Sequence, residues 1–490
     1  MQATELRDRL AVWDEGDAAR YIALATRLAA LADAGELPPG LQLPAERALA
    51  ETLQVSRGTV VRAYAVLRDE GRAVTRHGAG TVLGGEDVMP GSREARVAEV
   101  LPADSIYSFL EAPLRASGVI DVRGAHWNDG IDLPKEALTA FSGDVRDLLT
   151  TPGYAVAGLP ALREALAEHL TQNGLPTEPE EILPTTGAMQ AISLIAQLRL
   201  AAGDVVVTEE QSYPGALDAF RMLDAHLVGV EVGPNGADIG QLRAALRRRP
   251  ALVYLQPSCQ NPTGRTMPPA ARTMLIDALA ETDTIVIDDL TMAEMWWGNE
   301  KPPAPLAAHP RAPQDRILTV GSLSKSIWGG LRVGWIRGPR PTISRLARLK
   351  AATDLSSSLL NQALAVRLLT HHDQIVETKR ECLQERSMLV SDLLTEHLPE
   401  WSWLPPQGGL SLWIELGWGT STELGPFALR RGVSIAPSSV HDVHGRSRHR
   451  LRLPVTRYPD VLEETVERLS LAWEDYRHSA RRHGNTAVVI

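Results

Sequence analysis

Apolar residues in the first eighty positions fall into three blocks with helical spacing, followed by two short strand-like runs. The blocks predict helices over residues 18–34, 44–53 and 56–70. Ser56 is placed to cap the third helix, and Gly71 is placed to end it. The runs predict strands over residues 73–76 and 81–83, joined by a Gly-rich turn.

The third predicted helix has one apolar face. Val60, Tyr64 and Leu67 are spaced i, i+4 and i+7, so we expect them to point inward together. The polar residues left on its other faces include Arg57, Thr59 and Arg62. Three helices and a hairpin in this order describe a winged helix-turn-helix.

From about residue 116 the pattern changes to apolar strands that alternate with amphipathic helices such as 188–200. The strands are expected at 205–208, 252–255, 284–287, 317–320 and 333–336. Continuous apolar runs of this kind are typical of strands buried on both faces, so we predict an α/β fold with a large, mostly parallel sheet. Strands near 410–416 and 451–453, with long helices past residue 355, predict a smaller C-terminal α+β lobe.

These patterns divide the chain into three parts. Residues 1–83 form the winged helix-turn-helix, and residues 116–490 form the α/β domain with its lobe. Residues 84–115 mix Gly, Pro, Ser and charge without lasting periodicity, which is typical of a linker. The tail after Arg481 is expected to be loose.

Composition narrows the class of protein. The 490 residues carry a net charge of −10, so nucleic-acid binding has no support from the chain as a whole. Between Gly40 and Gly80, however, six arginines face four acids, which makes this part locally basic. Two cysteines, an N-terminus without the apolar core of a signal peptide, and no apolar stretch near the ~20 residues of a membrane span predict a cytoplasmic protein without membrane contact.

The basic part has the chemistry of a DNA reader. Arginine can bond guanine bidentately, and Ser56 and Thr59 near a helix N-terminus can bond phosphates. The alternative is that Ser56 only caps the helix and the arginines form a solvated face. Glu46 and Glu51 are expected to pair with arginines rather than to read cytosine.

The segment LQLPAERALAETLQVSRGTVVRAYAVLRDEGRAVTRHGAGTVL resembles the GntR-type winged helix. The resemblance implies double-stranded operator DNA as partner, with Ser56, Arg57 and Thr59 leading the recognition helix into the major groove. It also implies that Arg47 holds a phosphate or a base edge, and that a wing at His77 and Gly78 meets the minor groove. Gly58 departs from the family, which often has Thr there.

Among five lysines, Lys325 alone lies in a small-residue loop, GSLSKSIWGG, between two apolar strands. Such a loop places an amine at the C-terminal edge of a sheet, where α/β ligands bind. Ser322, Ser324 and Arg332 lie close in sequence and can donate to a phosphate. A lysine amine beside a phosphate site suits pyridoxal phosphate (PLP), which is held by a Schiff base.

Other segments supply what PLP requires besides the lysine. Asp288 follows a predicted strand and can ion-pair the pyridinium, with Asp289 as a competing assignment. The turn TTGAMQAI offers backbone N–H groups of a helix N-terminus to a phosphate, at Gly187, Ala188 and Met189. Tyr213 can stack on the ring or be a packing residue, and Asn261 can bond the ring hydroxyl or be a turn residue.

Together these segments resemble fold-type I PLP enzymes of the aspartate aminotransferase-like superfamily. The resemblance implies Lys325 as the Schiff-base lysine, Asp288 as the pyridinium partner and Arg452 in RLRLPV as the holder of a substrate or effector carboxylate. It implies that Tyr154 reaches the phosphate of a partner subunit, and hence a homodimer. A GntR-type winged helix fused to this domain is the arrangement of MocR-type regulators.

Three departures bear on function. Leu290 stands where the family usually has a tyrosine that bonds the ring hydroxyl, which puts efficient transamination in doubt. Cys259 replaces a histidine frequent in MocR proteins, and the segment RGAHWNDGIDLP is altered. The histidines of HDVHGRSRH, at 441, 444 and 449, lack the cysteine or carboxylate partners of a tetrahedral site, so we expect no metal.

We interpret the chain as a PLP-dependent transcriptional regulator that senses an amino acid, an amine or PLP itself. A second hypothesis is an aminotransferase with an attached DNA-binding head, which Asn261 favours and Leu290 opposes. A third is a PLP-independent repressor whose second domain only dimerises.

Overall fold

The computed structural model describes residues 3–10, 13, 20–33, 37, 41–69, 72–76, 80–83, 118–127, 134–298 and 302–484. The chain divides into two units, Met1–Ser108 and Phe109–Ile490, and each is described by itself. The predicted wing residues His77 and Gly78 and the predicted linker lie outside the described residues.

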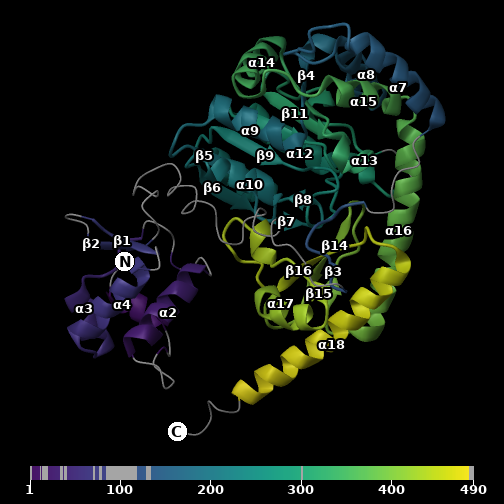
Figure 1. Ribbon diagram of the computed structural model, residues 1–490. Coiled ribbons are helices and arrows are strands. Elements are labelled where there is room, and N and C mark those ends of the chain that lie inside the picture. The colour runs from purple at the N-terminus through teal and green to yellow at the C-terminus, as the bar shows by residue number, and fades with distance from the viewer. Residues whose placement is uncertain are drawn as a thin grey trace. The chain divides into compact units, whose positions relative to one another are not determined.

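The first unit is a helical bundle with a hairpin (Figure 1). Its elements are α1 (Ala3–Leu10), α2 (Arg20–Asp33), α3 (Glu46–Leu53), α4 (Arg57–Asp69), β1 (Ala73–Arg76) and β2 (Gly80–Leu83), the strands being antiparallel. The inward face predicted for the last helix is confirmed, because Val60, Tyr64 and Leu67 are at most 1% exposed. Helix α1 was not predicted, although Leu6 and Leu10 place it in the same core.

A seven-stranded sheet organises the second unit (Figure 1). Its order is β4 (Ile182–Thr185), β12 (Gly334–Arg337), β11 (Ile317–Ser322), β10 (Ile285–Asp289), β9 (Leu252–Leu255), β5 (Val205–Glu209) and β6 (His226–Val230). Only β12 runs against its neighbours, so the mostly parallel sheet is confirmed. The five predicted strands are all present, while β4 and β6 were not predicted.

Helices cover both faces of this sheet, each over its own apolar core. One face carries α9 (Ala188–Arg199), α10 (Pro214–Arg221) and α14 (Arg340–Asp354). The other carries α8 (Pro160–Gln172), α11 (Ile239–Leu246), α12 (Pro269–Ala280) and α15 (Leu359–Leu369), with α7 (Lys135–Leu148) packed on α15. The two faces matter below, because alternate residues of a strand point to opposite faces.

The C-terminal lobe has a separate core. Its sheet orders β13 (Ser402–Trp403), β14 (Ser411–Glu415) and β16 (Arg450–Pro454), flanked by α16 (His372–His397), α17 (Ser421–Arg430) and α18 (Pro459–Gly484). The strand β3 (Ile120–Asp121) pairs with β15 (Val433–Ser434), so the start of the second unit joins this lobe. Helix α18 continues past Arg481, where a loose tail was expected.

None of the described helices combines the length and the apolar character that a membrane span requires.

Candidate functional site

Lys325 lies at the carboxyl edge of the sheet, in the short helix α13 (Leu323–Ser326) that follows β11. Ser322 caps this helix, because its Oγ accepts a hydrogen bond from Ser324 N at 3.2 Å. The Lys325 Nζ donates to the carbonyl of Ala125 at 3.0 Å. Burial, and then the charges of Arg452 and Arg332, lower the pKa of Lys325 to about 8. The amine is therefore partly uncharged near neutral pH, as a nucleophilic lysine must be.

Arg332 and the N-terminus of α9 form a second part of the site. Gly187 precedes α9 with φ of +127°, and a Cβ there would lie 3.0 Å from Arg332 Nη2. Arg332 Nη1 also lies 3.5 Å from Ser324 Oγ. A guanidinium, a hydroxyl and the first N–H groups of a helix, at Ala188 and Met189, thus converge where Gly187 leaves room. Together they suit a phosphate.

Tyr213 borders this part of the site. It is the N-cap of α10, and its ring lies against Gly215, where a Cβ would meet Tyr213 Cε1 at 2.9 Å and Met189 Sδ at 2.5 Å. Burial, and then the charge of Asp289, raise the pKa of the Tyr213 phenol to about 12, so it stays neutral. A neutral aromatic ring beside a helix N-terminus is suited to cover a planar ligand.

The two aspartates at the end of β10 point to opposite faces of the sheet. Asp288 Oδ2 accepts from Leu306 N at 2.8 Å, and Arg272 of α12 is its nearest compensating charge, which places it on the face away from Tyr213. Asp289 accepts from Tyr254 Oη at 2.6 Å and interacts electrostatically with Tyr213. Alternation along the strand puts Asp289 on the side of Tyr213. Its two oxygens, however, already accept from Tyr254, Gln256 and Thr291 N, whereas Asp288 Oδ1 is buried without a hydrogen-bond partner. The predicted assignment of Asp288 and the competing one of Asp289 therefore both stay predictions.

Arg452 extends into the space between the sheet and the lobe from β16. Its Nη2 donates to the carbonyl of Arg123 at 2.7 Å, and its Nη1 lies 3.4 Å from Asn261 Oδ1. Its Nε is buried without a hydrogen-bond partner. Burial lowers the pKa of this guanidinium to about 10, so it remains a cation suited to bind a carboxylate.

Residues 118–127, which we call the crossing segment, were not predicted to belong to the site. Two of its backbone carbonyls, those of Arg123 and Ala125, accept from Arg452 and Lys325. The ring of His126 lies among the same cations: burial, followed by Lys325 and Arg452, lowers its pKa to about 4. The departure noted in RGAHWNDGIDLP was the only available signal, because backbone acceptors leave no trace in a sequence.

Lys379 is a second residue that the sequence did not single out. It lies on α16 and is 3% exposed, and its Nζ donates to the carbonyls of Lys325 and Ile327. Trp127 of the crossing segment covers this ammonium at 5.3 Å. Lys379 thus bonds the last carbonyls of α13 and ties the Lys325 loop to α16. Charged neighbours in its sequence had hidden its burial.

Tyr154 stands apart from this group. Its side chain is 69% exposed, although the next residue is anchored by a 3.0 Å bond from Ala155 N to Ser356 Oγ. The three histidines of HDVHGRSRH are also separate from one another: His441 contacts the Ser212 carbonyl, His444 contacts Glu210 and His449 contacts the Gly419 carbonyl.

In the first unit, the polar side of α3 and α4 is exposed and basic. Arg47 and Arg57 are 84% and 70% exposed in their side chains, and Arg62 is also exposed. Arg47 pairs with Glu51 at 3.1 Å and Arg57 with Glu46 at 3.2 Å, the pairings expected for the two acids. Ser56 Oγ accepts from Thr59 N at 3.1 Å, so Ser56 does cap α4.

Two family models match the chain. Residues 20–83 match the model described as bacterial regulatory proteins, gntR family, and residues 130–469 match aminotransferase class I and II. The uncharacterized HTH-type transcriptional regulator YdfD of Bacillus subtilis is 31% identical over 83% of this chain and 86% of its own length. The 2-aminoadipate transaminase of Thermus thermophilus is 33% identical over 66% of this chain and 80% of its own.

Solved structures match the second unit. The α-aminoadipate aminotransferase LysN of Thermus thermophilus, complexed with N-(5'-phosphopyridoxyl)-L-leucine, superimposes with a TM-score of 0.71 at 29% identity. The match covers 78% of this chain and 97% of LysN. This likeness confirms the aminotransferase-like fold predicted for the second part of the chain.

Proposed function

The chain belongs to the GntR-type transcriptional regulators that carry an aminotransferase class I and II domain, and we propose from this premise that its second unit senses a small amino acid or amine. The cofactor of the family is PLP. In our proposal residues 1–83 bind operator DNA in the cytoplasm, residues 84–115 are the linker, and residues 116–490 bind PLP and the effector.

The residues around Lys325 fit PLP. The space at Gly187 that a Cβ would fill, together with Arg332, Ser322 and Ser324, suits the phosphate. Tyr213 would cover the ring, and Asp288, whose Oδ1 is buried without a hydrogen-bond partner, would hold the proton on the pyridine nitrogen. When bound, PLP supplies an electrophilic carbon for amines and an electron sink. Lys325 would hold that carbon covalently, which its pKa of about 8 favours.

One observation carries the sensing proposal. The crossing segment places its Arg123 carbonyl on Arg452, the residue suited to bind a carboxylate. An amino acid whose carboxylate binds Arg452 competes with that carbonyl, because a charged acceptor makes the stronger hydrogen bond. Only two residues separate the predicted linker, 84–115, from the crossing segment, 118–127, in the sequence. Effector binding would therefore release the hydrogen bond that holds the crossing segment, and with it the predicted linker to the DNA-binding unit. The size of this effect is limited by the difference in the ligand's affinity for the two conformations.

We also propose that the regulator acts as a homodimer on an operator with two half-sites. The exposure of Tyr154, on an anchored segment next to α8, supports a role toward a partner subunit. Two recognition helices on a two-fold axis would then read a palindromic operator.

Aminotransferase activity is the second candidate function. The observation that favours it is the contact between Arg452 and Asn261 beside a lysine of lowered pKa, a set that also suits catalysis. Turnover of an amino acid with a keto acid at enzyme-like rates, equal in a chain lacking residues 1–83, would favour this function over regulation.

The first experiment is fluorescence anisotropy with DNA from upstream of the protein's own gene, at fixed salt, with and without PLP. The expected result is specific binding that shifts with PLP and shifts again with a responsive amino acid. Arg452→Met should bind the same DNA but lose the second shift. Specific DNA binding that responds to neither PLP nor any amino acid would contradict the sensing proposal. Loss of specific DNA binding altogether would favour the aminotransferase.

A further inference from the structure

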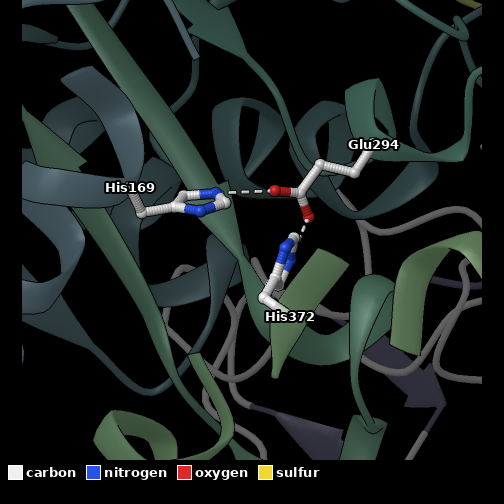
Figure 2. A group of neighbouring side chains, drawn as sticks. All are labelled: His169, Glu294 and His372. Carbon is white, nitrogen blue, oxygen red and sulfur yellow. Dashed lines mark hydrogen bonds and ion pairs between the residues drawn. The ribbon is translucent and has the colours of Figure 1, made fainter. Parts of the chain in front are cut away.

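Three side chains outside the PLP site meet in a compact group (Figure 2). His169 comes from α8, Glu294 from the short helix η2 (Ala293–Met295) and His372 from the first turn of α16. Glu294 lies between the two rings: its Oε1 is 2.7 Å from His169 Nε2 and its Oε2 is 3.1 Å from His372 Nε2. The atoms that could bind an ion all lie within 4.8 Å of one another.

The group is largely withdrawn from solvent. The side chains of His372, His169 and Glu294 are 5%, 10% and 22% exposed. Arg380 Nε fixes the backbone of η2, donating to the Glu294 carbonyl at 2.7 Å. Two imidazoles and one carboxylate, which are ligand types that metals bind in proteins, are thus held together away from solvent.

We propose that His169, Glu294 and His372 form a Zn²⁺ site, in which both imidazoles bind through Nε2 and Glu294 through its carboxylate. Zinc takes nitrogen and carboxylate ligands at 2.0–2.2 Å in a tetrahedron, which sets its donor atoms about 3.3 Å apart. The observed separations of 2.7 and 3.1 Å join the two rings to different oxygens of Glu294, and all the possible ligand atoms lie within 4.8 Å of one another. Side-chain rotations would bring these atoms onto one ion, and a water would complete its coordination.

The donor set selects the class of metal. Two imidazoles and a single carboxylate suit zinc, whereas Mg²⁺ and Ca²⁺ require shells of oxygen. Asp373 is the candidate for the second shell, because its exposed carboxylate lies 3.6 Å from His372 Nδ1, which has no hydrogen-bond partner. A rotation that brought the carboxylate within hydrogen-bond distance would orient the imidazole and raise its basicity.

A metal at this position would affect the segments that hold Lys325. Glu294 lies five residues after Asp289, and α16 carries both His372 and Lys379, whose amine bonds the carbonyl of Lys325. A metal that joins α8, η2 and α16 would fasten the segment after β10 to the helix that positions the lysine loop. Bound zinc should therefore raise the thermal stability of the second unit.

The test uses the full chain, stripped of metal by chelator and titrated with Zn²⁺ in competition with a chromophoric indicator. The expected result is one tightly bound Zn²⁺ per chain, and Co²⁺ in its place should give the intense visible bands of a four-coordinate site. His169→Gln and His372→Gln should each weaken binding by about 100-fold, and Asp373→Asn by about 10-fold. His226→Gln, at an exposed histidine on another element, is the matched control and should change nothing.

Stoichiometric zinc binding in the wild type, together with the cobalt spectrum, would support the site even if a variant failed to fold. Absence of Zn²⁺ binding at micromolar concentrations would overturn the proposal and leave the group as a carboxylate hydrogen-bonded to two histidines. Binding of equal strength in folded His169→Gln and His372→Gln would overturn it too, because the metal would then lie elsewhere. An increase of the unfolding temperature by Zn²⁺ should be seen in the wild type and lost in both variants.

Discussion

At the scale of residues, the reactivity of the site depends on cations that surround one amine. Lys325 is buried beside Arg452 and Arg332, and each of these factors disfavours its ammonium form. The same arginines are suited to bind the two anionic ends of a PLP–amino acid pair. Residues suited to bind the ligands thus also set the protonation of the lysine.

We predict that the rate at which PLP attaches to Lys325 rises with pH and levels off above about 8. The sign follows because only the uncharged amine reacts, and its fraction grows as pH passes the pKa. Arg452→Met removes one of the cations, so the midpoint should move to higher pH. Stopped-flow absorbance measures the rate, with Lys325→Ala as blank. Arg450→Met, on the same strand but paired with Glu415, should leave the midpoint in place; an unmoved midpoint in Arg452→Met would refute the electrostatic argument.

The adjacent aspartates allow a matched comparison. Asp288→Asn should weaken PLP binding by at least about 10-fold, because its Oδ1 is buried without a partner and its charge would stabilise a protonated pyridine nitrogen. Asp289→Asn should change PLP affinity by less than about 3-fold, since its oxygens already accept from Tyr254 and Thr291 N. Equilibrium titration followed by PLP absorbance measures both. The reverse order of effects would make Asp289 the pyridinium partner.

The choice between these aspartates shows where residue-level inference from sequence ends. The two adjacent aspartates at the end of β10 indicated an acid at the strand end, but not which of the two faces the ligand. Lys325 was identifiable because small residues and flanking strands set it apart from the other lysines. Arg123 and Ala125 were not, because they act through backbone carbonyls that any residue possesses.

At the scale of elements, the junction of β4 and α9 explains why the phosphate region needs glycine. Gly187 has a φ of +127°, and its missing side chain admits the Arg332 guanidinium. Gly334 in turn lacks the Cβ that would meet the backbone of Gly187 at 2.7 Å. The sequence revealed the turn through TTGAMQAI but not β4 itself, since ILPT is short and contains a proline. Strand β6 was not predicted either, because its residues His226 and Gly229 interrupt the apolar run.

Gly187→Ala should lower PLP affinity by about 10-fold and destabilise the second unit by about 1–2 kcal/mol, because it combines strain at positive φ with crowding of Arg332. Gly143→Ala is the opposite case: Gly143 is inside α7, and a Cβ there would meet nothing within 4 Å. It should stabilise the protein by about 0.5–1 kcal/mol and leave PLP affinity unchanged. Thermal denaturation and PLP titration of both variants separate the two effects. If both variants changed thermal stability and PLP affinity in the same way, the argument from positive φ and crowding at Gly187 would be wrong.

At the scale of the whole molecule, two patterns of different period predicted two units of different function. Helical blocks with a hairpin gave the first, and strand–helix alternation gave the second, so the fold could be inferred without any contact being known. The architecture of the lobe was harder to predict from the sequence, because β3 pairs with β15 from more than 300 residues away. Long-range pairing of short strands leaves no local pattern.

The division into units predicts that DNA affinity and PLP binding can be altered separately. Arg57 is exposed and pairs with Glu46 at the surface, and an ion pair of this kind contributes little to stability. Arg57→Ala should therefore weaken specific DNA binding by about 5- to 150-fold, the range for one lost base contact, with PLP absorbance unchanged. Arg311→Ala, an exposed and similarly paired arginine of the second unit, is the control and should leave DNA affinity as it is.

The salt dependence of binding identifies what Arg57 contacts. If it reads a base, Arg57→Ala should bring specific and competitor DNA closer in affinity while the slope against salt changes little. If it holds a phosphate, both DNAs should weaken together and the slope of log K against log salt should fall by about 1. Ser56 Oγ already accepts a hydrogen bond from Thr59 N in capping α4. We therefore expect Arg57, the next residue, to make the base contact. Wild-type affinity and slope in Arg57→Ala would place the recognition surface elsewhere on the first unit.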